Sequence, residues 1–168
     1  TMVTSVKSLF AAFGDQPNIA AFFNRCTDII KDMNMGNIFM GMMLVKFNCR
    51  TMTAAAAGMP PILIHHKGNG HVDELVMKGM PLGASRDFKY QDKEIEIFPG
   101  DTILLLSDGL PELFNQQKEM LDYPRIKKKF SEIANKPADD IISELIELGQ
   151  DWRKDEPLTD DCTFVVIK

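Results

Sequence analysis

The sequence has no apolar run near the ~18 residues that a membrane-spanning helix requires, and no charged-then-apolar signal segment at its start. It has three cysteines, Cys26, Cys49 and Cys162, and no Cys-x-x-Cys pair among them. An odd number of cysteines without that spacing disfavours both a disulfide framework and a zinc site. These features predict a protein of the reducing cytoplasm in which this segment makes no membrane contact.

An excess of positive charge is also missing. Nineteen Lys and Arg residues stand against 24 Asp and Glu, which gives a net charge of −5 and a pI near 5.2. Because nucleic-acid binding needs a basic surface, we predict no nucleic-acid partner. The one basic run, Lys127 to Lys129, lies between Ile126 and Phe130. A solvated helix face is favoured there over a binding patch. Gly-x-Ser-x-Gly, P-loop and Gly-x-Gly-x-x-Gly motifs are absent, which weakens serine-hydrolase and nucleotide-binding interpretations.

What is present suits one folded domain over residues 1–168, because 45% of the residues are hydrophobic. Apolar spacing predicts helices from Val3 to Phe13, from about 19 to 33 with Asn18 as its cap, and from Ala138 to Trp152 with Ile146 on its inner side. Hairpin-linked strands are expected at 38–47, 52–57, 62–64, 72–76 and 93–98. Buried strands are expected at 102–107 and 162–167. The predicted class is α+β, with helices packed on an antiparallel sheet.

Acidic residues stand at the ends of the two buried strands. Asp108 and Gly109 follow the strand at 102–107, and Asp160 and Asp161 precede the strand at 162–167. If these strands are neighbours, the carboxylates converge at one edge of the sheet, and Gly109 leaves room for a ligand or another backbone segment. Oxygen ligands without His or Cys suit Mg²⁺ or Mn²⁺. The alternative is that Asp-Gly is a common turn dipeptide and that Asp-Asp belongs to a polar loop before the strand.

Three histidines lie around a predicted glycine turn. His65 and His66 end one strand, and His71 begins the next. They could meet across this hairpin, but no cysteine or carboxylate stands in ligand register with them, so a metal role is disfavoured. The cluster of methionines between Met33 and Met43 is better explained as adaptable core filler.

The order of the motifs resembles a known family. Ala57-Gly-Met-Pro-Pro61 is followed by Gly79-Met-Pro-Leu-Gly83, then by Pro99 to Gly109 (PGDTILLLSDG), and finally by Asp160-Asp-Cys-Thr163. From about Ile38 onward this series is similar to the sporulation stage II E / RsbU branch of the metal-dependent protein phosphatases, which are relatives of the type 2C enzymes. Each motif alone is weak, but four in this order and spacing are specific. The chain departs from the family at Met59, where a histidine is usual, and at Ser107, where threonine is common.

The resemblance implies an α-β-β-α fold, an antiparallel β-sandwich flanked by helices, with a binuclear Mn²⁺ or Mg²⁺ centre. It implies that Asp108 and Asp160 are catalytic metal ligands and that Gly109, Asp161 and Thr163 support them. The implied reaction is hydrolysis of phosphoserine or phosphothreonine by metal-activated water. The implied substrate is a phosphoprotein of the anti-sigma-factor antagonist type in bacterial signalling, and the implied parent protein carries an upstream sensor or receiver domain.

The family also uses aspartates from Gly-Gly-Asp and Asp-x-x-Gly-like motifs ahead of its first long helix. Residues 1–37 contain no such motif, since Asp15, Asp28 and Asp32 lack the glycine context. We therefore expect a domain that lacks its N-terminal segment, binds metal weakly alone, has little activity alone and associates into homodimers through unpaired sheet edges. A non-catalytic, phosphatase-like docking or dimerisation module is the alternative function.

Overall fold

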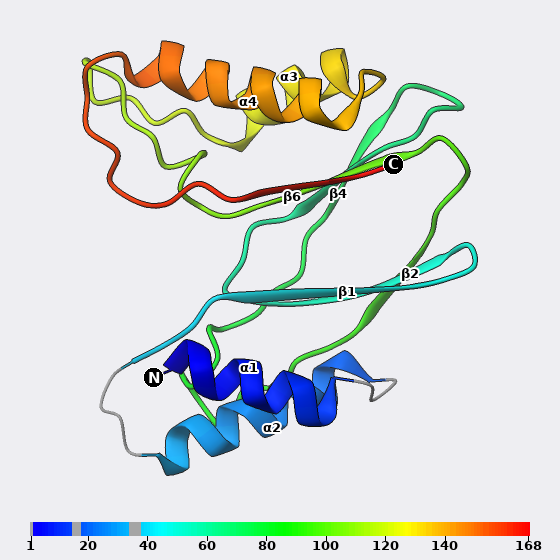
Figure 1. Cartoon of the computed structure of the whole chain (residues 1–168), viewed down its shortest axis with the longest axis vertical. Coiled ribbons are helices and arrows are strands. Elements are labelled where there is room, and N and C mark those ends of the chain that lie inside the picture. The colour runs from blue at the N-terminus through cyan, green and yellow to red at the C-terminus, as the bar shows by residue number, and fades with distance from the viewer. Residues whose placement is uncertain (1, 15–17, 34–37) are drawn as a thin grey trace. The chain divides into compact units, whose positions relative to one another are not determined.

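The computed structural model describes residues 2–14, 18–33 and 38–168. Within them the chain forms four helices and seven strands in two compact units (Figure 1). Unit 1 comprises Thr1–Met59 and Met77–Ile97, and unit 2 comprises Pro60–Val76 and Phe98–Lys168. Each unit is an antiparallel sheet with two helices packed on it, which confirms the α+β class. The single domain over residues 1–168 stays a prediction.

Unit 1 contains helices α1 (Met2–Phe13) and α2 (Ile19–Asp32), which lie on one face of a three-stranded sheet (Figure 1). Its strands are β1 (Met42–Asn48), β2 (Thr51–Ala57) and β5 (Lys93–Glu96), in the order β1-β2-β5. The expected cap of α2 is confirmed, because the Asn18 side chain accepts a hydrogen bond from Ala21 N at 2.6 Å. Asp92 adds a second acceptor, 2.6 Å from Ala20 N.

The core of unit 1 forms where large side chains of α2 meet small ones of β2. Phe22 and Phe23 are buried, and so are Ala55 and Ala57, whose small side chains let the helix approach the sheet. The strand expected at 38–47 is shorter in the structure. It begins at Met42, because Met40 exchanges two backbone hydrogen bonds with Leu82 instead of joining the ladder.

Unit 2 contains a four-stranded sheet in the order β4-β3-β6-β7, in which all pairs are antiparallel. Its strands are β3 (Ile62–His65), β4 (Val72–Leu75), β6 (Thr102–Leu106) and β7 (Phe164–Ile167). Helices α3 (Tyr123–Ile133) and α4 (Ala138–Arg153) lie along one face of this sheet (Figure 1).

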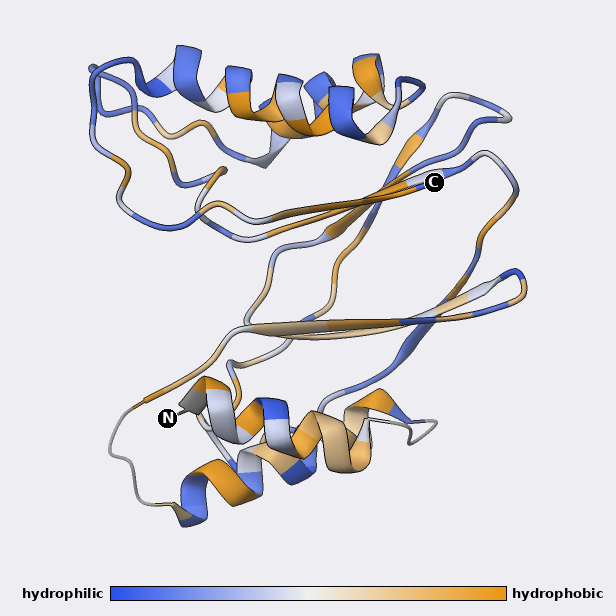
Figure 2. Ribbon diagram, viewed as in Figure 1, coloured by the Kyte–Doolittle hydropathy of each residue, from blue (hydrophilic) through white to orange (hydrophobic). Residues whose placement is uncertain are grey.

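Apolar residues follow the strands of unit 2 and the inner sides of its helices (Figure 2). Leu104, Phe130, Ile141 and Leu145 are fully buried in this core. The expectation that Ile146 also lies on the inner side of α4 is wrong, because Ile146 is 44% exposed. One residue corresponds to about 100° of helix rotation, which turns Ile146 away from the face that holds Leu145.

The basic run lies on α3, as the helix interpretation expects. Lys127 contacts Glu74 at 2.8 Å and Lys129 contacts Glu144 at 2.6 Å, so two of the three lysines are engaged in local ion pairs. In the part of the chain that the structure describes, no helix combines the length and the apolar character needed to cross a membrane.

Candidate active site

The strands that precede and follow the two acidic motifs are neighbours. β6 pairs with β7 in antiparallel register, and Leu106 lies opposite Phe164. In an antiparallel pair, the C-terminal end of one strand lies beside the N-terminal start of the other. The structure therefore brings the segment that carries Asp108 and the segment that carries Asp160 and Asp161 to the same end of the sheet of unit 2, as the sequence predicts.

Ser107 ties these two segments together. Its Oγ accepts a hydrogen bond from Thr163 N at 2.9 Å and donates one to the carbonyl oxygen of Asp161 at 3.1 Å. Its backbone N–H donates to the carbonyl of Thr163 at 3.1 Å. Sequence reasoning treated Ser107 only as a departure from the family pattern and missed this role. A hydroxyl residue directly before the Asp-Gly pair is the signal that could have indicated it.

Gly109 is required by the close approach of the same segments. A Cβ atom at this position would lie 2.4 Å from the carbonyl oxygen of Asp161 and 3.2 Å from Cys162 Sγ. The first separation is shorter than real Cβ contacts, and the obstructing atom belongs to the backbone. Of the two uses expected for Gly109, the structure therefore shows the approach of another backbone segment.

The carboxylates of Asp108, Asp160 and Asp161 create a local excess of negative charge. All three residues are exposed, and within the described ranges none of them forms an ion pair. Burial raises the pKa of Tyr123 to about 12, and nearby Asp108 adds to that rise. Burial also raises the pKa of the Cys162 thiol, with further contributions from Asp160 and Asp161. Arg153 opposes this effect at Cys162, but three acidic residues outnumber it. An accumulation of negative charge of this kind favours binding of a cation.

The chemistry of these side chains fits a hard divalent ion, but only in part. Carboxylate oxygens are suitable ligands for Mg²⁺ or Mn²⁺, and Mg²⁺ is commonly held by one or two carboxylates together with waters and phosphate oxygens. Among the described residues there is no group of three or more His, Cys, Asp or Glu that could hold a metal ion. Asp28 and Asp32 are instead paired with Arg86 at 3.6 and 2.5 Å, and Asp15 lies outside the described residues.

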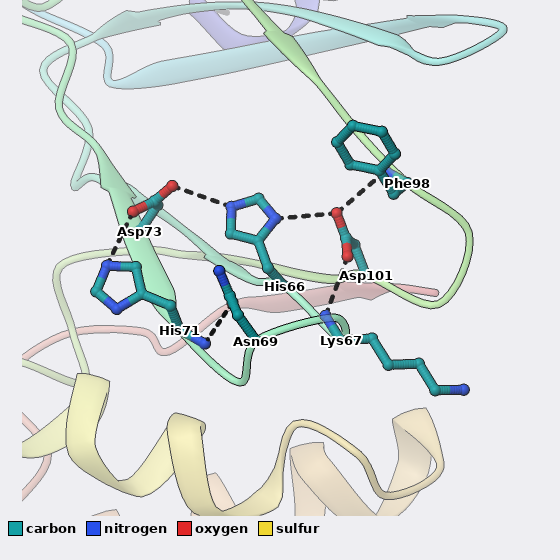
Figure 3. Close-up of polar contacts among 7 residues, drawn as sticks. All are labelled: His66, Lys67, Asn69, His71, Asp73, Phe98 and Asp101. Carbon is teal, nitrogen blue, oxygen red and sulfur yellow. Dashed lines mark hydrogen bonds and ion pairs between the residues drawn. The ribbon is translucent and has the colours of Figure 1, made fainter.

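A second polar cluster lies at the opposite end of the β6 strand (Figure 3). His66 contacts Asp101 through Nδ1 and Asp73 through Nε2, both at 3.0 Å, and His71 Nε2 lies 3.1 Å from Asp73. The structure thus connects two of the three histidines through Asp73. The expectation that no carboxylate accompanies these histidines is wrong, and the signal that could have indicated Asp73 is its place only two residues after His71. His65 lies apart from these contacts and is buried, with Nδ1 lacking a hydrogen-bond partner among the described residues.

Comparison with known proteins identifies the family. The family model for "Stage II sporulation protein E (SpoIIE)" matches residues 1–168. Among curated proteins, the chain is 26% identical over 155 residues to phosphoserine phosphatase RsbU of Bacillus subtilis (strain 168). The match includes 84% of this chain and 44% of RsbU, so the chain spans less than half the length of that relative.

Solved structures with the same fold include two phosphatase domains. The SiaA-PP2C domain of Pseudomonas aeruginosa has a TM-score of 0.82 at 20% identity, over 99% of this chain and 67% of the other. The phosphatase domain of the cell fate determinant SpoIIE from Bacillus subtilis, presoaked with Mn, has a TM-score of 0.67 at 20% identity. This match includes 98% of the present chain and 71% of the other. The chain therefore has the fold of PP2C-type phosphatase domains.

Proposed function

We propose, because the chain belongs to the stage II sporulation protein E family, that it forms part of a metal-dependent protein serine/threonine phosphatase. The observation that carries this proposal is the pair of strand-end carboxylates, Asp108 and Asp160, exposed and without ion-pair partners among the described residues. The sheet of unit 2 holds them at one end, and Asp160 Oδ1 accepts only a local hydrogen bond, from Asp161 N at 2.7 Å. Side chains of this kind are available for ligand binding.

Asp108 and Asp160 would hold Mn²⁺ or Mg²⁺, in a binuclear centre as the family resemblance implies. When bound, such ions lower the pKa of a water molecule and neutralise charge on the phosphoryl oxygens. The role of Ser107 is to fix the spacing of the two segments through Asp161 and Thr163. Gly109 permits their close packing. Misplacement of a catalytic group by about 1 Å can cost about 100-fold in rate, which makes this positioning part of the catalytic machinery.

The substrate we propose is phosphoserine or phosphothreonine on a regulatory protein of the anti-sigma-factor antagonist type. Support comes from the family match and from RsbU, which is described as a phosphoserine phosphatase. A cytoplasmic location, an upstream sensor or receiver domain and a homodimeric state belong to the same proposal. Sedimentation of the protein over a wide concentration range tests the homodimer, which a monomer at every concentration would contradict.

Metal binding by this chain alone is expected to be weak. Two carboxylates supply only part of the roughly six oxygens that each hard cation requires, and the described residues bring no third ligand to them. Isothermal titration of the chain with Mn²⁺ checks this expectation. Tight binding by residues 1–168 alone would show that the chain already holds a complete site.

The decisive experiment measures Mn²⁺-dependent release of phosphate from an aryl phosphate by the full-length protein. Asp108→Asn and Asp160→Asn should each lower the rate by about 100-fold or more, because each removes an anionic metal ligand. Asp151→Asn, an exposed aspartate of α4, is the matched control and should retain the rate. Full activity in Asp108→Asn would remove this residue from the site.

A non-catalytic docking or dimerisation module is the second candidate, favoured by the absence of a third metal ligand among the described residues. Folded full-length protein without any metal-dependent phosphate release would select this alternative. Retained binding of a phosphoprotein by that inactive protein would then define its function.

A further inference from the structure

Unit 2 has an apolar groove beside the carboxylates. Its lining residues come from α4, from the segment between α4 and β7, from the start of β7 and from the segment that follows β6. The groove encloses about 130 Å³. We call this hollow the apolar groove. Its apolar lining residues are Leu110, Leu113, Ile146, Leu158, Cys162 and Phe164, and Gln150 and Arg153 are their polar neighbours.

The apolar groove is open to solvent. Leu158 is 59% exposed and Ile146 is 44% exposed, although both have large aliphatic side chains. Gly149 also lines the groove, and a Cβ there would lie 2.9 Å from Leu110 Cδ1, so the absence of a side chain lets α4 lie close to the segment that follows β6. Exposed aliphatic side chains that gather around a hollow are a feature of ligand-binding surfaces.

The groove lies close to the candidate active site, because the same two segments contribute residues to both. Leu110 follows Asp108 by two residues, and Cys162 follows Asp160 by two residues. The two segments touch where Cys162 Sγ lies 3.2 Å from the position of a Cβ on Gly109. A peptide bound at the carboxylates through a phosphate therefore has the groove within reach of a residue near the phosphorylated one.

We infer that the apolar groove binds an aliphatic side chain close to the phosphorylated residue of the protein substrate, and that Leu158 and Ile146 set this preference. The inference rests on the proposed phosphatase function and adds a specificity site to it. An apolar cavity of about 150 Å³ accepts a benzene-sized molecule, so the groove has room for one branched side chain. A second copy of the chain fits less well, since a stable interface buries about 800 Å² on each partner.

The test uses fluorescein-labelled phosphoserine peptides and the full-length protein in the presence of Mn²⁺. The peptides share a Gly-Ser background, each carries one leucine at a different distance from the phosphoserine, and one peptide carries none. Fluorescence anisotropy gives the dissociation constants. At least one leucine position should tighten binding about tenfold, the effect expected when an aliphatic group enters an apolar pocket.

Leu158→Ser and Ile146→Ser should each abolish most of this leucine advantage. Met120→Ser is the matched control, because Met120 is 42% exposed in the same unit but does not line the groove. Equal binding of all peptides, or an advantage that survives both groove substitutions, would overturn the inference. A shift from dimer to monomer in Leu158→Ser would assign the groove to a second copy and overturn it as well.

Aryl phosphate hydrolysis in the same preparations separates this inference from the proposed function. An aryl phosphate is too small to fill both sites, so Leu158→Ser should hydrolyse it at the rate of the unmodified protein. If the protein hydrolyses the aryl phosphate but binds all peptides equally, the proposed phosphatase function stands and the proposed specificity site is wrong. If leucine tightens peptide binding but the aryl phosphate is not hydrolysed, the groove is supported as a peptide-binding site and the proposed catalytic function is wrong.

Discussion

The two ends of β6 carry aspartates of opposite character. Asp101, just before the strand, is 4% exposed and accepts hydrogen bonds from Phe98 N, Lys67 N and His66. Asp108, just after the strand, is exposed and has no ion pair within the described ranges. One residue type thus joins two turns of the fold at one end of a strand and remains available for chemistry at the other.

The bonding at the Asp101 end favours the protonated form of His66. Both ring nitrogens face a carboxylate oxygen at 3.0 Å (Figure 3), and a neutral imidazole has only one N–H to donate. Only the protonated ring satisfies both contacts. Burial alone would lower the pKa of His66, but the hydrogen bonds to Asp101 and Asp73 outweigh it and raise the pKa above 6.5. Burial would raise the pKa of Asp101, yet bonds from Phe98, His66 and Lys67 lower it.

The largest expected effect on stability is that of Asp101→Ala. This change leaves two backbone N–H groups and His66 without their acceptor, and loss of such a buried charged partner costs about 3 kcal/mol. Urea unfolding followed by circular dichroism measures it. A loss below about 1 kcal/mol would show that water replaces the carboxylate and that the contrast between the two ends is weaker than the contacts indicate.

Gly109→Ala should cost about 2 kcal/mol, because the new Cβ would meet the Asp161 carbonyl and force apart the segments at the Asp108 end. Gly68→Ala is the matched control, since a Cβ there would meet no atom within 4 Å. The two variants are compared by thermal unfolding. Equal stability of the two variants would mean that the segments after β6 and before β7 can move apart without cost. That result would contradict the positioning role of Gly109.

His66→Gln should remove a pH dependence worth about 1 kcal/mol. Because the folded pKa of His66 is raised, its contribution is complete below the unfolded value of 6.5 and is lost as the pH rises through the folded pKa. The Asp101 contribution is present above the unfolded value of 3.8 and is lost as the pH falls. The cluster therefore stabilises most between about pH 4 and 6.5.

Thermal unfolding of the unmodified protein and of His66→Gln across the range above pH 6.5 tests this prediction, because the difference between the two curves isolates His66 from the other histidines. A difference that grows with rising pH would reverse the sign of the linkage and contradict a protonated His66.

Asp108→Asn should change the free energy of unfolding least, by less than about 0.5 kcal/mol, because the exposed carboxylate has no ionic partner to lose. The measurement is the same urea titration as for Asp101→Ala. The same variant is expected to lose activity. Lost activity with unchanged stability would identify Asp108 as a functional carboxylate and not a structural one. A large destabilisation would instead assign Asp108 to the fold.

Local sequence rules predicted most of the helices and strands, because the formation of these elements depends mainly on residues that are close in the chain. Asn18 caps α2 through a hydrogen bond only three residues along the chain. A hairpin joins β1 to β2, as expected for the strands at 38–47 and 52–57. The β1 boundary was wrong because Met40 is bonded to Leu82, a residue from a distant loop. The expected position of Ile146 was wrong, because the spacing of apolar residues locates the centre of a helix's apolar face more reliably than its edges.

The sequence by itself determined the α+β class, the family resemblance and the two acidic motifs, because each is a pattern of adjacent residues. Only the tertiary structure decided that β6 and β7 are partners, that Ser107 and Gly109 fix the spacing of the carboxylate segments, and that Asp101 binds His66. Those contacts join residues far apart in the chain, and their geometry comes from strand pairing and core packing, which short motifs do not encode.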